Sequence, residues 1–304
     1  MKIGGFRMFS GGLKKGDVIG IASPSRIATH EDYDPVFRAI EAMGLGWKAA
    51  DHLFDADWGY ANSDENRAAD LNQLICDDQV KMIFFGGGEG GDEIIPLIDY
   101  QAAREHPKIW MGFSDGTSVL SAIRHRAGQT VYYGQSPRNL LDASEYNRRQ
   151  FAAHILQGKP ACHEQSGPGR TLVPGKARGV LSGGYLENYT WLSNSGWILP
   201  EEGKEYILVL EEHRMFFGPE HFSDEIGRLE QAPIFRRVKG VLFGLYADEP
   251  NEYALQRMER LGRRHGIPVA YCEDFGHGEN NAIFPLGAAA ELDTREGTLR
   301  YFYE

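Results

Sequence analysis

Cysteine, long apolar runs and positive charge are all scarce in this sequence of 304 residues, and each absence narrows what the protein can be. The three cysteines, at positions 76, 162 and 272, form no C-x-x-C motif, so neither a disulfide framework nor a zinc knuckle is supported. No apolar run approaches the roughly 18 residues of a membrane helix, and no basic-then-apolar signal pattern opens the chain. These absences predict a reduced, cytoplasmic protein with no membrane partner.

Positive charge is outweighed by negative charge throughout the chain. Lys and Arg number 32 against 43 Asp and Glu, which gives a formal net charge of -11. The basic residues are scattered, whereas surfaces that bind nucleic acid or anionic membranes usually carry basic patches. We therefore expect no nucleic-acid partner. The hydrophobic content of 42% is ordinary for a globular protein, and the length suggests about two domains.

Short β-type runs alternate with helical patterns along the chain, which predicts parallel sheets covered by helices, the α/β class. In the first half, strands are predicted at 18–22, 82–85, 109–113 and 130–133, and helices at 33–43, 64–75, 117–126 and 144–156. In the second half, strands are predicted at 206–210, 239–245, 268–272 and 299–302, and helices at 186–193, 224–229 and 253–265.

A stretch rich in glycine and proline separates the two halves. It covers residues 157–177 and shows no periodicity, so we interpret it as a linker. The predicted domains are then 1–156 and 178–304, the second being the smaller.

The most informative segment covers residues 108–117, where an apolar strand pattern runs into G-x-S-x-G and then into a helix. Ser114 is the central residue of this motif. A serine hydroxyl is a poor nucleophile at neutral pH, so it needs a sharp strand-to-helix turn, a neighbouring base and amide donors for the oxyanion. With 37 glycines in the chain the motif alone is weak, and the flanking strand and helix carry most of the inference.

Two further polar positions follow predicted strands, where the active sites of open α/β sheets lie. One is the pair Glu211 and Glu212, and the other is His277 between two glycines. A serine, a carboxylate and a histidine are the parts of a catalytic triad, in which the imidazole takes the serine proton and the carboxylate steadies the imidazolium. Taken singly, each of these residues also fits a turn, a helix terminus or a solvated surface.

The glycine loop at 86–91 allows more than one interpretation. It contains G-x-G-x-x-G after a strand, so a dinucleotide site is formally possible, with Asp115 as the ribose-binding acid. Asp92 and Glu93 directly after the loop would repel a pyrophosphate. The loop could instead present an amide to Ser114 as part of an oxyanion hole with the Asp115 amide, or be a glycine turn without chemistry.

The chain resembles the LD-carboxypeptidases, a family of serine peptidases that includes muramoyl-tetrapeptide carboxypeptidase and the microcin C immunity hydrolases. The resemblance extends over nearly the whole length, through the motifs at residues 16–25, 87–90, 94–99, 112–117, 183–186, 208–212, 276–277 and 284–287. It implies Ser114 as nucleophile, Glu211 as triad carboxylate and His277 as general base. The oxyanion donors would be the amides of Gly88 and Asp115.

The resemblance also implies an N-terminal Rossmann-like sheet domain, a smaller C-terminal α/β domain, and a homodimer that needs no metal or cofactor. We predict a serine carboxypeptidase that cleaves the LD-peptide bond of a murein tetrapeptide. Gly86 replaces an arginine that is frequent in the peptidoglycan enzymes, and residues 214–219 are not the usual continuation. These departures leave open a microcin-immunity-like hydrolase of peptidyl-nucleotides or acyl-amino acids. The alternatives of other classes are a dinucleotide-binding oxidoreductase and a non-catalytic amino-acid-binding module.

Overall fold

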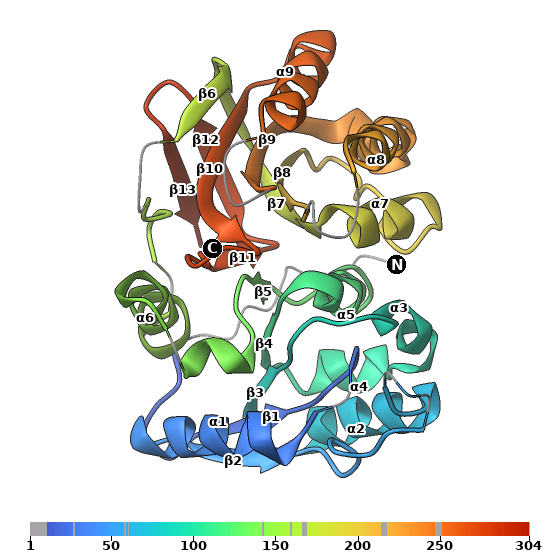
Figure 1. Ribbon diagram of the computed structural model, residues 1–304, viewed down its shortest axis with the longest axis vertical. Coiled ribbons are helices and arrows are strands. Elements are labelled where there is room, and N and C mark those ends of the chain that lie inside the picture. Colours follow the sequence, from blue (N-terminus) through green and yellow to red (C-terminus); the bar gives the residue numbers. More distant parts are fainter. Residues whose placement is uncertain are drawn as a thin grey trace. The chain divides into compact units, whose positions relative to one another are not determined.

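The computed structural model describes residues 11–303 except 27, 58, 60, 142, 159, 166–168, 214–217 and 247–250. The chain divides into two compact units, Met1–Lys159 and Pro160–Glu304, which are described one at a time as unit 1 and unit 2. Each contains a sheet and helices, so the α/β class is confirmed (Figure 1).

Unit 1 contains a parallel sheet with the strand order β5-β4-β3-β1-β2. Its strands are β1 (Val18–Ile21), β2 (Gly46–Ala49), β3 (Val80–Phe84), β4 (Ile109–Gly112) and β5 (Val131–Tyr133). Its helices are α1 (His30–Ala42), α2 (Asp64–Cys76), α3 (Gly91–Ile94), α4 (Tyr100–Glu105), α5 (Thr117–Ala122) and α6 (Glu145–Phe151). Figure 1 draws α1 to the left of the strands and α2, α4 and α5 to their right. A strand that is covered on both faces has a continuous apolar sequence. Strand β4 is an example, since every one of its residues is buried.

Local sequence signals explain where several of these helices begin and end. The predicted cap of α2 is confirmed, because the Ser63 hydroxyl accepts a hydrogen bond from the Asn66 amide at 3.3 Å. The predicted helix 117–126 is α-helical only to Ala122 and continues as a π-helical turn over Ile123–Ala127. The predicted helix 144–156 likewise passes into a π-helical turn, Ala152–Gln157, after α6.

The strand order of unit 1 determines where a ligand site would lie. An order of 2-1-3-4-5 reverses direction between β1 and β3, and open α/β sheets bind ligands in the crevice at the carboxyl ends of the strands beside such a reversal. The turn at 23–25 follows β1, and the glycine loop at 86–91 follows β3. The segment with Ser114 follows β4, the next strand along. All three therefore lie at the favoured edge of the sheet.

Unit 2 contains a mixed sheet with the order β13-β12-β7-β8-β9-β10-β6. Strands β7 to β10 are parallel, and β6, β12 and β13 pair antiparallel at the two sides. The strands of this sheet are β6 (Arg170–Val173), β7 (Lys176–Tyr185), β8 (Tyr206–Glu211), β9 (Val238–Leu245), β10 (Val269–Gly276), β12 (Ala289–Asp293) and β13 (Thr298–Phe302), and unit 2 also contains the short strand β11 (Phe284–Leu286). The helices are α7 (Leu186–Asn194), α8 (Pro219–Gln231) and α9 (Glu252–His265).

The segment predicted as a linker, 157–177, contains regular structure. Strand β6 lies within it and pairs with β10, and β7 begins at its end. Every residue of β6 is exposed or half-buried because the strand lies at the edge of the sheet. No apolar pattern therefore marks it in the sequence.

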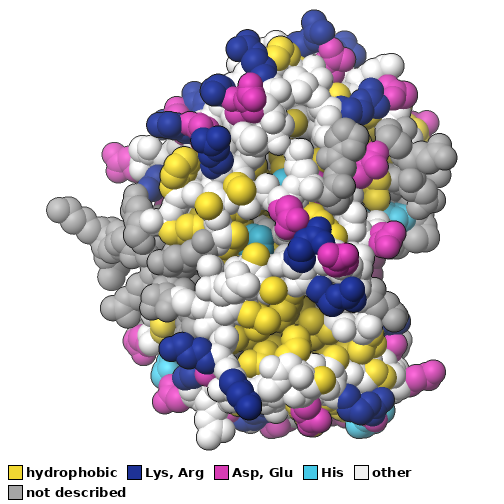
Figure 2. Space-filling model, turned by 90° about the vertical axis from the view of Figure 1, so that its left-hand side faces the viewer, with side chains coloured by type: hydrophobic (Ala, Val, Ile, Leu, Met, Phe, Trp, Pro, Cys, Tyr) yellow, Lys and Arg dark blue, Asp and Glu magenta, His cyan; other side chains and the backbone are white. Residues whose placement is uncertain are grey.

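The distribution of surface charge and the state of the cysteines agree with what the composition predicts. On the face shown in Figure 2, basic side chains (dark blue) lie interspersed with acidic ones (magenta). Within the described ranges, no helix combines the length and the apolar character needed to cross a membrane. Cys76, Cys162 and Cys272 are free thiols, and only Cys272 is buried.

Candidate active site

Ser114 has a backbone conformation that is rare outside glycine. It follows β4 directly after Phe113 and begins a single 3-10 turn, Ser114–Gly116, that leads into α5. Its φ is 55°, and it is the one non-glycine residue with a positive φ among those the structure describes. Such a residue costs about 1–3 kcal/mol and persists only where its surroundings hold it, typically at functional sites. This is the strand-turn-helix geometry of a nucleophile elbow.

One side chain of the neighbouring strand β5 and one backbone hydrogen bond hold the Ser114 turn. The Ser114 amide donates to the hydroxyl of Tyr133, the fully buried last residue of β5, at 3.2 Å. The amide of Gly116 donates to the Phe113 carbonyl at 2.9 Å, which closes the turn. The role of Tyr133 was not predicted, since the sequence pattern indicated only a strand residue.

The glycine loop packs directly against Ser114. A Cβ on Gly87 would lie 2.4 Å from the Cβ of Ser114 and 3.1 Å from its Oγ. Gly88 has a φ of 153°, and a Cβ there would lie 2.1 Å from the Ser25 carbonyl oxygen. That oxygen accepts a hydrogen bond from the Glu89 amide at 2.6 Å. Only glycine fits these two positions, and the exposed backbone of Gly88 remains open to a ligand.

Asp115 connects the elbow to the same loop through its side chain. It is 5% exposed, and its Oδ2 accepts a hydrogen bond from the Gly91 amide at 2.7 Å. Unit 1 therefore brings together Ser114, the Asp115 backbone and the loop that carries Gly88, which are the residues predicted for the nucleophile and the oxyanion hole.

In unit 2 the predicted carboxylate and histidine are hydrogen-bonded to each other. Glu211 ends β8 and is fully buried, and His277 follows β10 with its side chain 17% exposed. The Nδ1 of His277 lies 3.0 Å from the Oε2 of Glu211. A carboxylate at this distance favours the tautomer with the proton on Nδ1, which makes Nε2 the ring atom that can accept a proton. The Asn281 side chain donates to the Gly276 carbonyl at 2.8 Å and so fixes the backbone just before His277.

Three aromatic or acidic neighbours surround this pair. The rings of Tyr185 and His213 lie edge-on to His277, with centroid distances of 5.4 Å and 4.9 Å. Burial raises the pKa of Glu212 to about 8, against the opposing effect of hydrogen bonds from the Tyr185 side chain and the His213 amide. The two adjacent carboxyl groups therefore have different environments. Glu211 is hydrogen-bonded to His277, whereas the raised pKa of Glu212 favours its protonated form at neutral pH.

Comparison with known sequences identifies the family. The profile of the LD-carboxypeptidase N-terminal domain matches residues 19–134, and that of the C-terminal domain matches residues 178–292. The chain belongs to the LD-carboxypeptidase family. The predicted resemblance, and with it the expectation of a peptidase fold and a hydrolase, is confirmed.

Individual relatives align with this chain over almost its full length. A protein of Bacillus subtilis (strain 168) named probable murein peptide carboxypeptidase is 27% identical over 299 residues, which span 94% of this chain and 92% of the relative. The microcin C7 self-immunity protein MccF of Escherichia coli is 28% identical over 322 residues, with 92% of each chain covered. Among solved structures, an MccF-like protein of Bacillus anthracis str. Ames superposes with a TM-score of 0.85 at 23% identity, covering 97% of this chain and 99% of the other.

The geometry around the glycine loop at 86–91 argues against a dinucleotide site. The carboxylate of Asp115, which would have to bind a ribose, accepts the Gly91 amide instead. The helix after the loop, α3, has four residues, and Asp92 and Glu93 lie in its first turn. Like charges at that position disfavour a phosphate.

One group of residues in unit 2 has the composition of a metal site. The ligand atoms of His163, Cys272 and Asp274 lie within 4.8 Å of one another, and all three residues are buried. His163 Nε2 is 3.2 Å from Asp274 Oδ2, so the pair is already explained as an internal hydrogen bond. Burial raises the pKa of the Cys272 thiol, which disfavours the thiolate that binds metals. We assign this cluster no part in catalysis.

Proposed function

We propose that this member of the LD-carboxypeptidase family is a serine peptidase that hydrolyses a C-terminal amide through an acyl-enzyme. The observation that carries the proposal is the positive φ of Ser114 at the end of a central strand. Glycine could adopt this backbone conformation without the cost of about 1–3 kcal/mol. A serine at this position therefore indicates that its hydroxyl group has a function.

The proposed reaction follows from the groups at hand. The Ser114 Oγ attacks the amide carbon while His277 Nε2 takes its proton, and Glu211 stabilises the imidazolium. The negative oxygen accepts hydrogen bonds from the amides of Gly88 and Asp115. His277 then protonates the leaving nitrogen, the amine departs, and water attacks the acyl-enzyme with His277 as the base. The second attack releases the carboxylate product and restores the serine.

The state of Glu212 supports the choice of Glu211 as the triad carboxylate. The pKa of about 8 means that Glu212 is uncharged at neutral pH, and it contributes no negative charge that would compete for the imidazolium. The 3.0 Å contact with His277 belongs to Glu211.

The substrate that we propose is a murein tetrapeptide, cleaved at its LD-peptide bond. The name of the Bacillus subtilis relative supports this substrate class. A second candidate is a peptidyl-nucleotide or acyl-amino acid. The glycine at position 86 supports it, as do solved structures of MccF in complex with glutamyl sulfamoyl guanosine and with aspartyl sulfamoyl adenosine.

A substrate panel distinguishes the two candidates. The wild-type protein and Ser114→Ala are incubated with murein tetrapeptide and with a peptidyl-nucleotide, and the released amine is identified by mass spectrometry. Release of the C-terminal D-amino acid supports the carboxypeptidase, and release of an aminoacyl-nucleotide moiety supports the alternative. Turnover of either substrate by Ser114→Ala at the wild-type rate would refute the serine mechanism.

We also propose the domain division, the location and the oligomeric state of the protein. The nucleophile is carried by an N-terminal domain, residues 1–156, and the triad carboxylate and histidine by a C-terminal domain, residues 178–304. The protein acts in the cytoplasm as a homodimer, as its family resemblance implies. Light scattering on the purified protein should give the mass of two chains, and a monomer mass at micromolar concentration would contradict the dimer.

A further inference from the structure

The glycine loop has to be held in place by something other than secondary structure. Residues 85–90 belong to no helix or strand, yet the proposed mechanism uses the Gly88 amide as an oxyanion donor. An oxyanion hole works only when its donors lie at about 2.7–3.1 Å from the position of the negative oxygen. The contacts that fix this loop therefore matter for the rate.

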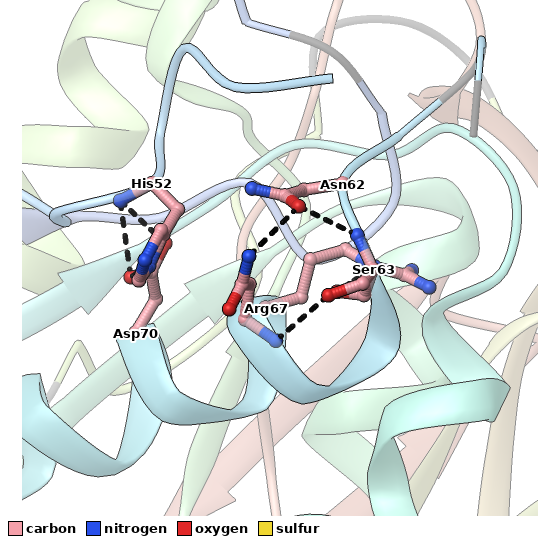
Figure 3. Close-up of polar contacts among 6 residues, drawn as sticks. His52, Asn62, Ser63, Arg67 and Asp70 are labelled. Atoms are coloured by element: carbon pink, nitrogen blue, oxygen red, sulfur yellow. Dashed lines mark hydrogen bonds and ion pairs between the residues drawn. The ribbon is translucent and has the colours of Figure 1, made fainter. Parts of the chain in front are cut away.

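Arg67 of α2 makes the most extensive of these contacts. Its side chain is 2% exposed. One terminal nitrogen, Nη1, donates to the carbonyl of Pro24 at 2.6 Å and to the carbonyl of Gly90 at 2.9 Å. The other, Nη2, donates to Glu93 Oε2 at 2.5 Å. The Nε donates to the Ser63 carbonyl at 3.3 Å. Figure 3 shows Ser63 and Arg67 close together at the start of α2.

The bonds of the two terminal nitrogens join two separate parts of the chain to one planar group, because Gly90 and Glu93 lie in one continuous stretch. Pro24 lies in the turn after β1, Gly90 in the loop after β3, and Glu93 in α3. A guanidinium is rigid and presents its donors in a fixed fork, so it sets the spacing of the groups that it binds. Arg67 therefore fixes the distance between the 23–25 turn and the glycine loop.

Direct contacts link the 23–25 turn to the glycine loop, and the glycine loop to Ser114. The Ser25 carbonyl, next to Pro24, accepts the Glu89 amide at 2.6 Å and lies against Gly88. Gly87 in turn lies against Ser114, where an added Cβ would come within 2.4 Å. A shift of the turn or of the loop would thus move the Gly88 amide relative to Ser114.

We propose that Arg67 is a positioning residue, which holds the Gly88 amide at the distance from Ser114 that the oxyanion requires. This inference rests on the proposed function. Arg67 touches neither the substrate nor Ser114, and it acts through the backbone of the 23–25 turn and the glycine loop.

The test compares Arg67→Lys, Arg67→Ala and a control, Arg38→Ala. Arg67→Lys keeps the positive charge but loses the planar fork. Arg38 is an exposed arginine of α1, so Arg38→Ala removes the same charge from unit 1 without touching the loop. We measure kcat and KM, the rate of fluorophosphonate labelling at Ser114, and the thermal unfolding of each variant.

The expected result is a loss of kcat with little change in KM, because the oxyanion bond forms only in the transition state. The loss should lie between about 10-fold and the roughly 10²–10³-fold that removal of one oxyanion donor costs. Guanidinium, at concentrations far below those that unfold the protein, should restore part of the kcat of Arg67→Ala. Arg38→Ala should keep the wild-type kcat.

The outcomes separate this inference from the proposed function. If the wild-type protein is not labelled at Ser114, the proposed function fails and this inference fails with it. If the wild type is labelled but Arg67→Lys turns over at the wild-type rate, this inference alone is wrong. A loss of kcat that only follows the loss of folded protein, without rescue by guanidinium, would also overturn the positioning role.

Discussion

Glu212 gives the protein a stability that depends on pH. The side chain is fully buried beside Glu211, and burial raises the pKa of its carboxyl group from 4.5 to about 8. The folded protein therefore keeps a proton on Glu212 between these two pH values, whereas the unfolded chain releases it. Because the folded state binds the extra proton, the contribution of Glu212 to stability is complete below about pH 4.5 and is lost as the pH rises to about 8.

The size of this effect follows from the shift. One proton held only by the folded state changes the free energy of unfolding by about 1.4 kcal/mol per pH unit. Between pH 5.5 and 7.5, two pH units that lie inside this range, the contribution of Glu212 should therefore fall by about 2–3 kcal/mol. Glu212→Gln keeps the size of the side chain and cannot ionise, so this part of the pH dependence should disappear in the variant.

Urea unfolding at several pH values measures the difference. The free energy of unfolding is determined for the wild type, for Glu212→Gln and for Glu202→Gln, a control with an exposed glutamate. The wild-type value minus the Glu212→Gln value should fall by about 2–3 kcal/mol from pH 5.5 to 7.5. The same subtraction with Glu202→Gln should stay constant. A Glu212→Gln variant with the same pH dependence as the wild type would refute the reasoning.

Three further predictions concern the site itself. His277→Ala should lose most of the turnover in steady-state assays because Ser114 then lacks its base; a variant that keeps the wild-type kcat would count against His277 as the base. Tyr133→Phe removes the acceptor of the Ser114 amide, so urea unfolding should show a loss of about 1 kcal/mol together with a lower kcat. Gly88→Ala places a Cβ 2.1 Å from the Ser25 oxygen, and kcat should fall at least about 10-fold in steady-state assays, whereas an unchanged kcat would exclude Gly88 as a donor.

Local features were predictable from the sequence because their causes are local. The strand-turn-helix around Ser114 and the Ser63 cap are set by residues within a few positions. The strands before Glu211 and His277 were marked by apolar runs. Strand β7 was missed because it begins in the glycine- and proline-rich segment and contains three glycines itself.

Contacts between distant segments were not predictable in the same way. Arg67 binds carbonyl groups 23 and 43 residues away, and no periodicity reports such a pairing. One signal was present, since Arg67 lies four and seven positions before Leu71 and Leu74 and so shares the apolar face of α2. The shifted pKa of Glu212 depends on burial by the complete unit 2 fold and had no sequence signal.

The most direct test of the central claim is covalent labelling of Ser114. The wild-type protein, Ser114→Ala and His277→Ala are treated with a fluorophosphonate, and the modified peptide is mapped by mass spectrometry. The account predicts one adduct on Ser114 in the wild type, none in Ser114→Ala, and much slower labelling in His277→Ala, because the serine then lacks its base. An adduct on another residue, or hydrolysis that continues after Ser114 is fully labelled, would contradict it.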